Sequence, residues 1–159
     1  MLRSWLKLPQ EKQAAITREW AKADLYFLLR YLLRRTDCER EWIFARCREV
    51  QEQPNGHLDL WARDHYKSTI ITVAKTIQDI LASHGDDPLP EWDGREATVG
   101  IFSCTRPIAK GFLRQIKREF EANQMLLGIF PDVLWENPQK DAPKWSEDAG
   151  LVLNRQGNP

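Results

Sequence analysis

The sequence contains few cysteines, no net charge and no long apolar run, and each shortage excludes a class of protein. Its three cysteines, Cys38, Cys47 and Cys104, form no C-x-x-C pair and have no histidine at ligand spacing, so we expect neither a disulfide framework nor a zinc site. Lys and Arg together number 23, as do Asp and Glu, which argues against a protein that coats DNA by charge alone. No apolar run approaches the roughly 18 residues of a membrane span. We therefore expect a reducing, cytosolic setting, with Cys104 as a small buried residue.

Glycine is missing from the most informative stretch of the chain, residues 58–71 (LDLWARDHYKSTII). This stretch predicts an apolar strand, a polar turn and an apolar helix that opens with Lys-Ser-Thr. A helix start holds anions through its free N–H groups and dipole, while a lysine reaches the outer phosphates and a hydroxyl ligates Mg²⁺. The usual pattern, G-x-x-x-x-G-K-[ST], has glycine where this chain has Trp61 and Tyr66. Spacing alone leaves two interpretations open, a phosphate-binding loop or an exposed strand–helix corner with an incidental lysine.

Helical spacing dominates the first third of the chain. Residues 9–35 predict a helix that opens at Pro9, and Asp37 is expected to cap a second helix that runs through Val50. Residues 51–56 follow as a polar turn. The apolar face of the first helix is expected to contain Leu25, Leu28, Leu29 and Leu32.

Strands and helices alternate in the rest of the chain. Residues 57–62 and 98–103 predict strands, residues 68–83 predict a helix, and another helix follows Thr105. Residues 123–145 are expected to be rich in loops, and residues 151–153 favour one more short strand. The inward faces of the two helices are expected to contain Ile70, Val73, Ala74, Ile77, Ile80 and Leu81 in the first, and Ile108, Phe112, Ile116 and Phe120 in the second.

This order predicts an α/β fold in which a helical lead-in, residues 1–56, precedes a partial P-loop NTPase-type core, residues 57–159. The core would be a parallel sheet with flanking helices, because strand–helix–strand units form right-handed crossovers. Ligands of such sheets bind at the carboxyl ends of the strands, where Lys67 and Thr105 are both expected.

With these segments assembled, the sequence resembles the large subunit of tailed-phage terminases, the ATP-driven motor that packages DNA. The resemblance extends over most of the chain from about residue 20, and terminases are known for deviant Walker A loops. It rests on the stretches 24–31 (DLYFLLRY), 58–72 (LDLWARDHYKSTIIT), 101–117 (IFSCTRPIAKGFLRQIK), 123–134 and 142–146 (APKWS).

The resemblance implies an ATP site at residues 63–69. Lys67 would be the Walker A lysine that binds phosphate, and Ser68 would ligate Mg²⁺, with Thr69 next to it. Arg63 would act in cis on the γ-phosphate, where a guanidinium can neutralise the charge that develops during transfer. The remaining loop residues that would contact the nucleotide are Asp64, His65 and Tyr66.

Other interpretations of these residues stay open at this point. Arg63 could equally form a salt bridge with Asp59 or Asp64. The adenine contact of such enzymes comes from upstream, so Gln51 and Gln53 are both candidates. The basic residues that follow Thr105, Arg106 and Lys110, are either DNA contacts or part of a solvated helix face.

The family's Walker B motif, an apolar run that ends in acidic residues, is not found in the sequence. Glu147 and Asp148 follow Trp145 and Ser146 with no apolar run before them. The coupling motif and the C-terminal nuclease domain are not found either, so we expect the front part of a longer protein that hydrolyses ATP slowly or not at all by itself.

Two functions of different kinds follow from the resemblance. The first is the ATP-binding part of a motor that packages double-stranded DNA in the host bacterial cytoplasm, together with the rest of the large subunit, the small terminase subunit and the portal protein, without contact with a membrane. The second is a non-catalytic interaction module, or prophage remnant, that docks the small subunit or portal through its N-terminal helices. An unrelated nucleotide-dependent transferase is a weaker third, because nothing in the sequence marks a substrate pocket.

Overall fold

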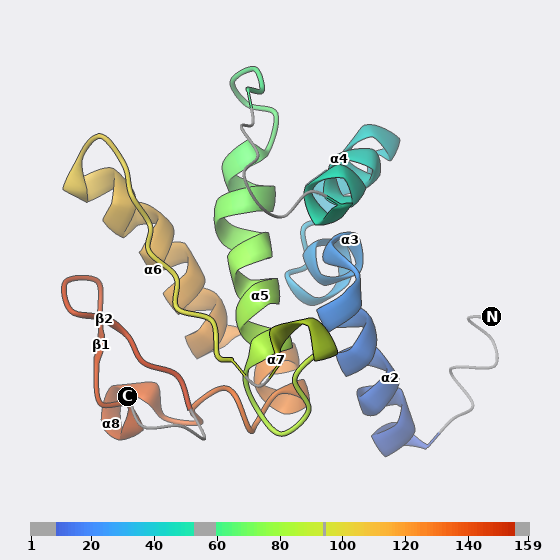
Figure 1. The fold of residues 1–159 in the computed structure, drawn as a ribbon, viewed down its shortest axis with the longest axis vertical. Helices are drawn as coiled ribbons and strands as arrows, with labels where there is room; N and C mark the ends of the chain where they lie inside the picture. Colours follow the sequence, from blue (N-terminus) through green and yellow to red (C-terminus); the bar gives the residue numbers. More distant parts are fainter. Residues whose placement is uncertain (1–8, 53–59, 94, 155–159) are drawn as a thin grey trace.

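The computed structural model describes residues 9–52, 60–93 and 95–154, and most of these residues are helical (Figure 1). The elements are α2 (Gln10–Ala23), α3 (Leu25–Phe27), the π-helix η1 (Leu28–Leu32), the 3₁₀ turn η2 (Thr36–Cys38), α4 (Glu41–Glu52), the π-helix η3 (Ser68–Lys75), α5 (Thr76–Ser83), the 3₁₀ turn η4 (Pro90–Trp92), α6 (Arg106–Ala122), α7 (Gln124–Ile129), α8 (Pro138–Asp141), β1 (Trp145–Ser146) and β2 (Gly150–Leu151).

The helix predicted over residues 9–35 is present but interrupted at Asp24. The backbone of Asp24 is extended, and its side chain accepts a hydrogen bond from the Phe27 amide at 2.9 Å, which caps the start of α3. η1 continues α3 with the wider turns of a π-helix. All four leucines of the predicted apolar face are fully buried. The second helix begins at Glu41, so the cap predicted at Asp37 is wrong.

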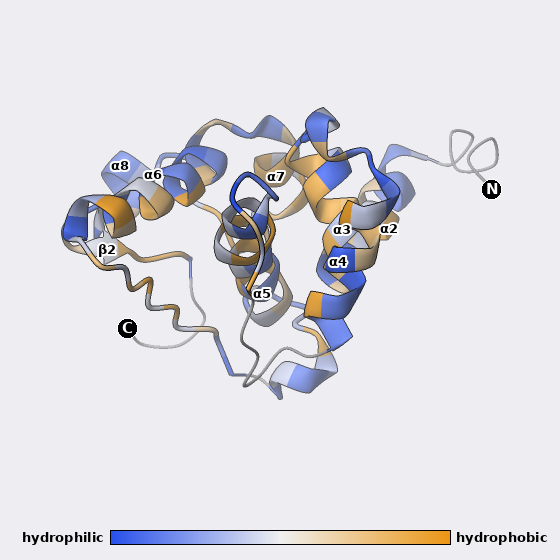
Figure 2. Cartoon of the chain, turned by 90° about the horizontal axis from the view of Figure 1, so that it is seen from above, coloured by the Kyte–Doolittle hydropathy of each residue, from blue (hydrophilic) through white to orange (hydrophobic). Residues whose placement is uncertain are grey.

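The helix predicted over residues 68–83 is confirmed as the continuous pair η3 and α5. It lies in the middle of the molecule and packs against α2 and α6 (Figure 1). Every residue of its predicted inward face, Ile70, Val73, Ala74, Ile77, Ile80 and Leu81, is buried. In Figure 2, orange apolar stretches alternate with blue polar ones along the helices, as expected when each helix buries one face.

The predicted parallel sheet is wrong. Among the described residues the only strand pairing is an antiparallel two-residue ladder, in which Trp145 of β1 lies opposite Leu151 of β2 and Ser146 lies opposite Gly150. The molecule is therefore a mostly helical fold in which helices pack on helices, and not a P-loop NTPase-type sheet with flanking helices. Of the strand predicted at residues 151–153, only Leu151 is in a strand.

The two runs predicted as parallel strands are not paired. Residues 57–59 lie outside the described ranges, residues 60–62 have no regular structure, and residues 95–103 run as an open segment alongside α6 (Figure 1). The side chain of Leu60 is 82% exposed and that of Phe102 is 94% exposed. Alternating apolar residues stabilise a strand only when neighbouring strands cover them and bond its backbone, and the described part of the chain supplies no such neighbour.

An arginine of α2 ties the N-terminal helices to two distant loops. The Arg18 guanidinium contacts both carboxylate oxygens of Asp132, at 2.7 and 2.6 Å, and its Nε donates to Asp87 at 2.9 Å. Lys22 Nζ, almost fully buried, lies 2.8 Å from the Asp87 carboxylate. Burial raises the pKa of Asp132, but the hydrogen bonds from Arg18 and from the Asp86 amide outweigh it and hold the pKa below its usual range. The network thus crosslinks segments more than a hundred residues apart.

The cysteines differ in their environment. Cys38 and Cys47 are buried, whereas Cys104 is exposed, so its predicted burial is wrong. Burial raises the pKa of the Cys38 thiol to about 11 and that of Cys47 to about 12. In the described ranges, no helix is long and apolar enough to cross a membrane.

Candidate phosphate-binding loop

Residues 63–66 form a turn, and helical backbone begins at Lys67, directly before η3. Asp64 and Tyr66 have positive φ angles of 61° and 58°. Tyr66 therefore adopts, at the second glycine position of the phosphate-loop pattern, the left-handed backbone that glycine favours there. A side chain in this conformation costs roughly 1–2 kcal/mol, so contacts elsewhere must hold the turn in place.

Those contacts come from the segment around α4. The ring of Trp42 lies 5.7 Å from that of His65 and 6.2 Å from that of Tyr66, measured between centroids. The Arg35 guanidinium lies 6.0 Å from the centroid of the Tyr66 ring. Hydrogen bonds from Arg35, and to a smaller extent from Tyr66, lower the pKa of Asp37. The loop is thus fixed through its aromatic side chains, which a loop built from glycine would not possess.

The helix that follows the turn has a free N-terminal end. The Ile70 amide donates to the Tyr66 carbonyl at 2.8 Å, which closes the first helical turn. No side chain of the described residues caps this helix, so the amides of Lys67, Ser68 and Thr69 remain available to an anion.

Two cations accompany these amides. Arg63 and Lys67 are both exposed, and neither has an ion-pair partner within the ranges that the structure describes. The alternative partner Asp64 makes no ion pair with Arg63, and Asp59 lies outside the described ranges. Exposed, uncompensated cations at a helix start favour an anionic ligand, because both the dipole and the point charges attract it.

The metal site predicted at Ser68 has little support from the protein alone. Ser68 is half-buried at the helix start and offers a single hydroxyl oxygen. The described residues contain no group of three His, Cys, Asp or Glu side chains that could hold a metal ion. One hydroxyl fits Mg²⁺ only as a supplement to phosphate oxygens and water, so the residues fit a metal that arrives with a nucleotide.

Thr69 faces a different part of the molecule. It lines a cavity of about 280 Å³ between η1, η3 and α6, together with Leu33, Arg35 and Arg118. The seven predicted site residues are consecutive, so they lie together along the chain, and Thr69 is the one among them that lines this cavity.

Of the two glutamines considered for adenine, the structure describes only Gln51. Gln51 accepts a hydrogen bond from the Leu25 amide at 3.0 Å and donates to the Ala23 carbonyl at 2.9 Å. Its amide group is thus used to join α4 to the α2–α3 junction, and Gln53 lies outside the described ranges.

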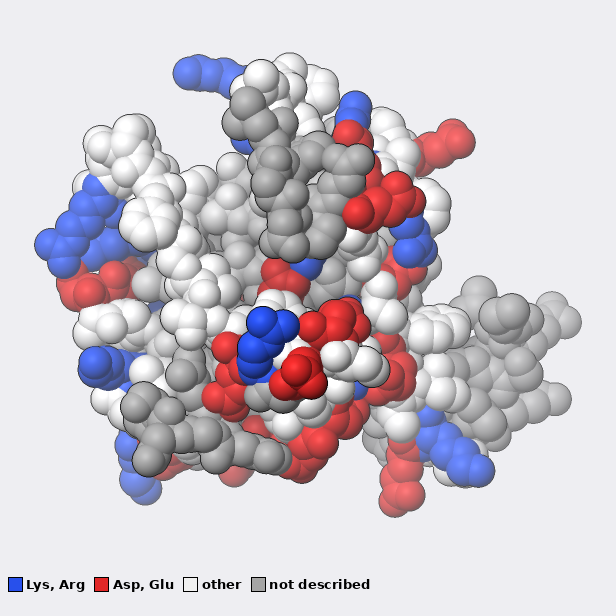
Figure 3. Space-filling view, viewed as in Figure 1, with Lys and Arg blue, Asp and Glu red and all other residues white. Residues whose placement is uncertain are grey.

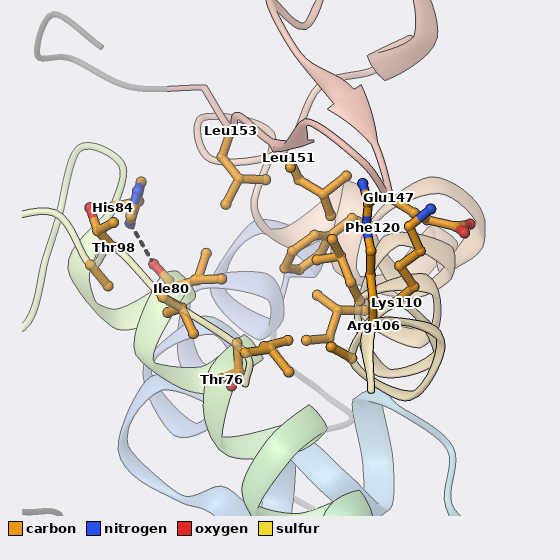
Figure 4. Close-up of a pocket in the computed structure, with 17 residues that line it drawn as sticks. Thr76, Ile80, His84, Thr98, Arg106, Lys110, Phe120, Glu147, Leu151 and Leu153 are labelled. Carbon is orange, nitrogen blue, oxygen red and sulfur yellow. Dashed lines mark hydrogen bonds between the residues drawn. The ribbon is translucent and has the colours of Figure 1, made fainter. Parts of the chain in front are cut away.

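A separate cavity of about 310 Å³ lies between α5, α6, the open segment 95–103 and the β1–β2 hairpin (Figure 4). Ile80, Phe120, Leu151 and Leu153 give it apolar walls, whereas the side chains of Arg106, Lys110 and Glu147 gather at the α6 side. No residue of the predicted ATP loop lines this cavity.

Sequence reasoning missed the residues that hold the loop, namely Arg35, Asp37 and Trp42. They lie some 24 to 31 residues before Tyr66, and nothing in their spacing links them to it. Comparisons with protein-family models, with curated proteins and with solved structures found no match for this chain. The resemblance to terminases therefore rests on the sequence motifs alone.

Proposed function

We propose that residues 63–69 bind the phosphates of ATP together with Mg²⁺. The observation that carries this proposal is the positive φ angle of Tyr66, the left-handed backbone that glycine readily adopts and that supports a phosphate loop at this position of the pattern. The helix start without a side-chain cap supports it, as do Arg63 and Lys67, for which the described residues supply no ion-pair partner. In this proposal Lys67 contacts the outer phosphates, Ser68 adds one oxygen to Mg²⁺, and Arg63 lies near the γ-phosphate.

The proposal extends to the biological role that the sequence resemblance implies. We propose that the chain belongs to a terminase-type motor that packages double-stranded DNA in the host bacterial cytoplasm, with the small terminase subunit and the portal protein as partners. The described residues contain no group of three His, Cys, Asp or Glu side chains that could hold a metal ion, so in this proposal Mg²⁺ arrives with the nucleotide.

A test of ATP binding uses a fluorescent ATP analogue with Mg²⁺. We expect saturable binding by the wild-type chain and at least a tenfold weaker affinity for Lys67→Ala, since a phosphate would lose its direct cation. Lys140→Ala is the matched control, because Lys140 is also an exposed lysine without an ion-pair partner among the described residues. Equal binding by Lys67→Ala and the wild type, with the control unchanged, would rule out this loop as the site.

A second function, docking of a protein partner through the N-terminal helices, is favoured by one observation. Trp20, Phe27 and Tyr31 form a row with ring centroids 5.3 and 5.2 Å apart, while Trp20 is 46% exposed and Tyr31 is 55% exposed. Exposed aromatic rows are typical of protein interfaces. Capture of a small terminase subunit that is lost in Trp20→Ala/Tyr31→Ala and kept in Lys67→Ala would support it; capture unchanged by both would remove it.

A further inference from the structure

Four basic residues follow one another along α6 at intervals of four, namely Arg106, Lys110, Arg114 and Arg118. Residues at this spacing lie one helical turn apart, so the row extends over roughly 18 Å at about 1.5 Å per residue. The side chains of Arg106 and Arg114 are 74% and 66% exposed. We call this row the basic row of α6.

The turn between β1 and β2 covers the first three members of the basic row with two carboxylates. Asp148 lies 2.6 Å from Arg106 and 2.5 Å from Lys110, and Glu147 binds Arg114 with two parallel contacts of 2.9 and 2.6 Å. Figure 3 shows the resulting blue and red atoms side by side at the edge where α6 and the hairpin lie. The hydrogen bond from Arg114 lowers the pKa of Glu147, and that from Lys110 lowers the pKa of Asp148, so both turn residues are charged at neutral pH.

The charges do not balance along the row. Two carboxylates face three cations, and Arg118 has no ion-pair partner in the described part of the chain. Like charges at four-residue spacing repel each other, so the row attracts further anions even with the turn in place.

The turn is weakly attached to the rest of the molecule. Its ladder is two residue pairs long, and its residues, Ser-Glu-Asp-Ala-Gly, contain no large apolar side chain. Gly150 has no atom within 4 Å of the place where a side chain would begin. Ion pairs that water reaches contribute less to stability than fully buried ones, so a stronger polyanion can displace the two carboxylates, of which Asp148 is 63% and Glu147 24% exposed.

An exposed aromatic residue comes shortly before this row in the sequence, in the open segment 95–103. Phe102, which is 94% exposed, precedes Arg106 by four residues. Its ring folds back over Gly100, since a Cβ at Gly100 would meet the ring edge at 2.8 Å. Cations that follow a backbone, combined with an aromatic face for a base, are the elements of a single-strand binding surface.

We propose that the basic row of α6 and Phe102 bind a single-stranded nucleic acid, and that Glu147 and Asp148 act as a built-in competitor for its phosphates. The Glu147 carboxylate occupies Arg114 in the two-pronged manner in which a phosphate would. Phe102 favours a single strand over a duplex, whose bases are already stacked, and over an acidic peptide, which has no base to stack. The proposal is independent of ATP binding at residues 63–69.

The test measures fluorescence anisotropy of a 20-nucleotide single strand between about 50 and 200 mM salt. We expect Glu147→Gln/Asp148→Asn to bind about tenfold more tightly, because the strand no longer has to displace two carboxylates, and to keep a similar log–log salt slope, because the same three cations contact phosphates in both proteins. Glu91→Gln/Glu136→Gln is the control, since it changes the net charge equally through two exposed glutamates outside the hairpin. If the control variant gained the same affinity for the oligonucleotide, or if the turn variant gained none, the proposed role of Glu147 and Asp148 as competitors would be wrong.

Two further arms distinguish the ligands. Phe102→Ala is expected to weaken binding of the single strand several-fold and to leave binding of the matching duplex unchanged. A duplex bound as tightly as the single strand, with no effect of Phe102→Ala, would overturn the assignment to single strands. Polyglutamate bound as tightly as the oligonucleotide would overturn the assignment to nucleic acid.

Release of the turn can be followed in the wild-type chain itself. The Ala149 amide donates to the Ser146 hydroxyl at 3.0 Å, and the Val152 amide donates to the Lys144 carbonyl at 2.9 Å. If the strand displaces the turn, the Ala149 amide exchanges with solvent faster when the oligonucleotide is bound, while Val152 keeps its rate. If the Ala149 amide exchanged at the same rate or more slowly with saturating oligonucleotide, the turn would have stayed in place, and its proposed role as a competitor would be wrong.

Discussion

Two groups of ion pairs in the molecule are built from the same residue types, basic side chains and carboxylates, but differ in how far they are buried. Around Arg18, the guanidinium and the Asp132 carboxylate are 13% and 18% exposed and join α2 to two distant loops. Around Asp148, the carboxylate is 63% exposed and its partner Arg106 is 74% exposed. The contact distances are both 2.6 Å, so geometry alone does not separate the groups. Burial does, because water screens and replaces the exposed pairs but not the buried ones.

The largest effect is expected from Arg18→Ala. This change leaves Asp87 and Asp132 without their main cation and removes the guanidinium from the Phe130 ring, 4.6 Å away. Breaking one side of a largely buried pair costs about 3 kcal/mol, which urea unfolding followed by circular dichroism would measure. Arg106→Ala, the matched removal of an exposed arginine, is expected to change the free energy of unfolding by less than about 0.5 kcal/mol. Similar losses in both variants would contradict the distinction between the two groups.

Acid is expected to have the next largest effect. The folded state lowers the pKa of Asp132 and of Asp87, whose burial is outweighed by hydrogen bonds from Arg18 and Lys22. A group with a lowered folded pKa stabilises the protein fully above its unfolded pKa and loses that contribution as the pH falls through the folded pKa. The urea concentration at the midpoint of unfolding should therefore decrease as the pH is lowered below about 4 to 5. This decrease should be shallower in Asp132→Asn. An Asp132→Asn profile with the slope of the wild type would exclude the network as its source.

The smallest effect on stability is expected at the hairpin turn. Each ion pair that Glu147→Gln/Asp148→Asn removes has at least one side chain that is more than 60% exposed, so the free energy of unfolding should change by less than about 0.5 kcal/mol. Thermal and urea unfolding of this variant beside the wild type would measure it. A loss above about 1.5 kcal/mol would mean that the turn is a structural clamp and belongs with the Arg18 network.

Sequence patterns predicted the helices well where one face is buried along the whole element. The inward face of residues 68–83 is buried as predicted, because helical spacing directly specifies a buried stripe. The α6 stripe is only partly correct: Ile116 and Phe120 are buried, but Ile108 is 46% exposed, since the first turns of α6 lie away from the core. The spacing of apolar residues therefore predicts which face of a helix is buried, but not how much of the helix length the packed neighbours cover.

The sheet could not be predicted from single segments. An apolar run specifies that a strand is possible, whereas the strand forms only if another segment bonds its backbone. Residues 98–103 have the run but no strand beside them in the described structure. The stretch expected to be loop-rich contains α7, whose start was readable: Asn123 accepts hydrogen bonds from the Met125 and Leu126 amides, as an N-cap asparagine does.

The candidate loop was found from the sequence because its residues are consecutive. The residues that contact the loop and fix its shape could not be found in this way, because Trp42, Arg35 and Asp37 come from a different part of the chain. The lack of glycine at residue 66 counted against the loop in the sequence, yet Tyr66 adopts the backbone that glycine would and adds contacts to α4 that glycine could not.

The unequal burial of the three cysteines makes the chain convenient for site-specific chemistry. Thiol reagents act on the thiolate, and two of the thiols are shielded by burial, with pKa values of about 11 and about 12. Cys104 is exposed two residues before α6 begins. A maleimide dye at neutral pH would therefore label the native sequence at a single position beside Phe102 and Arg106, where its emission would report any ligand that arrives there.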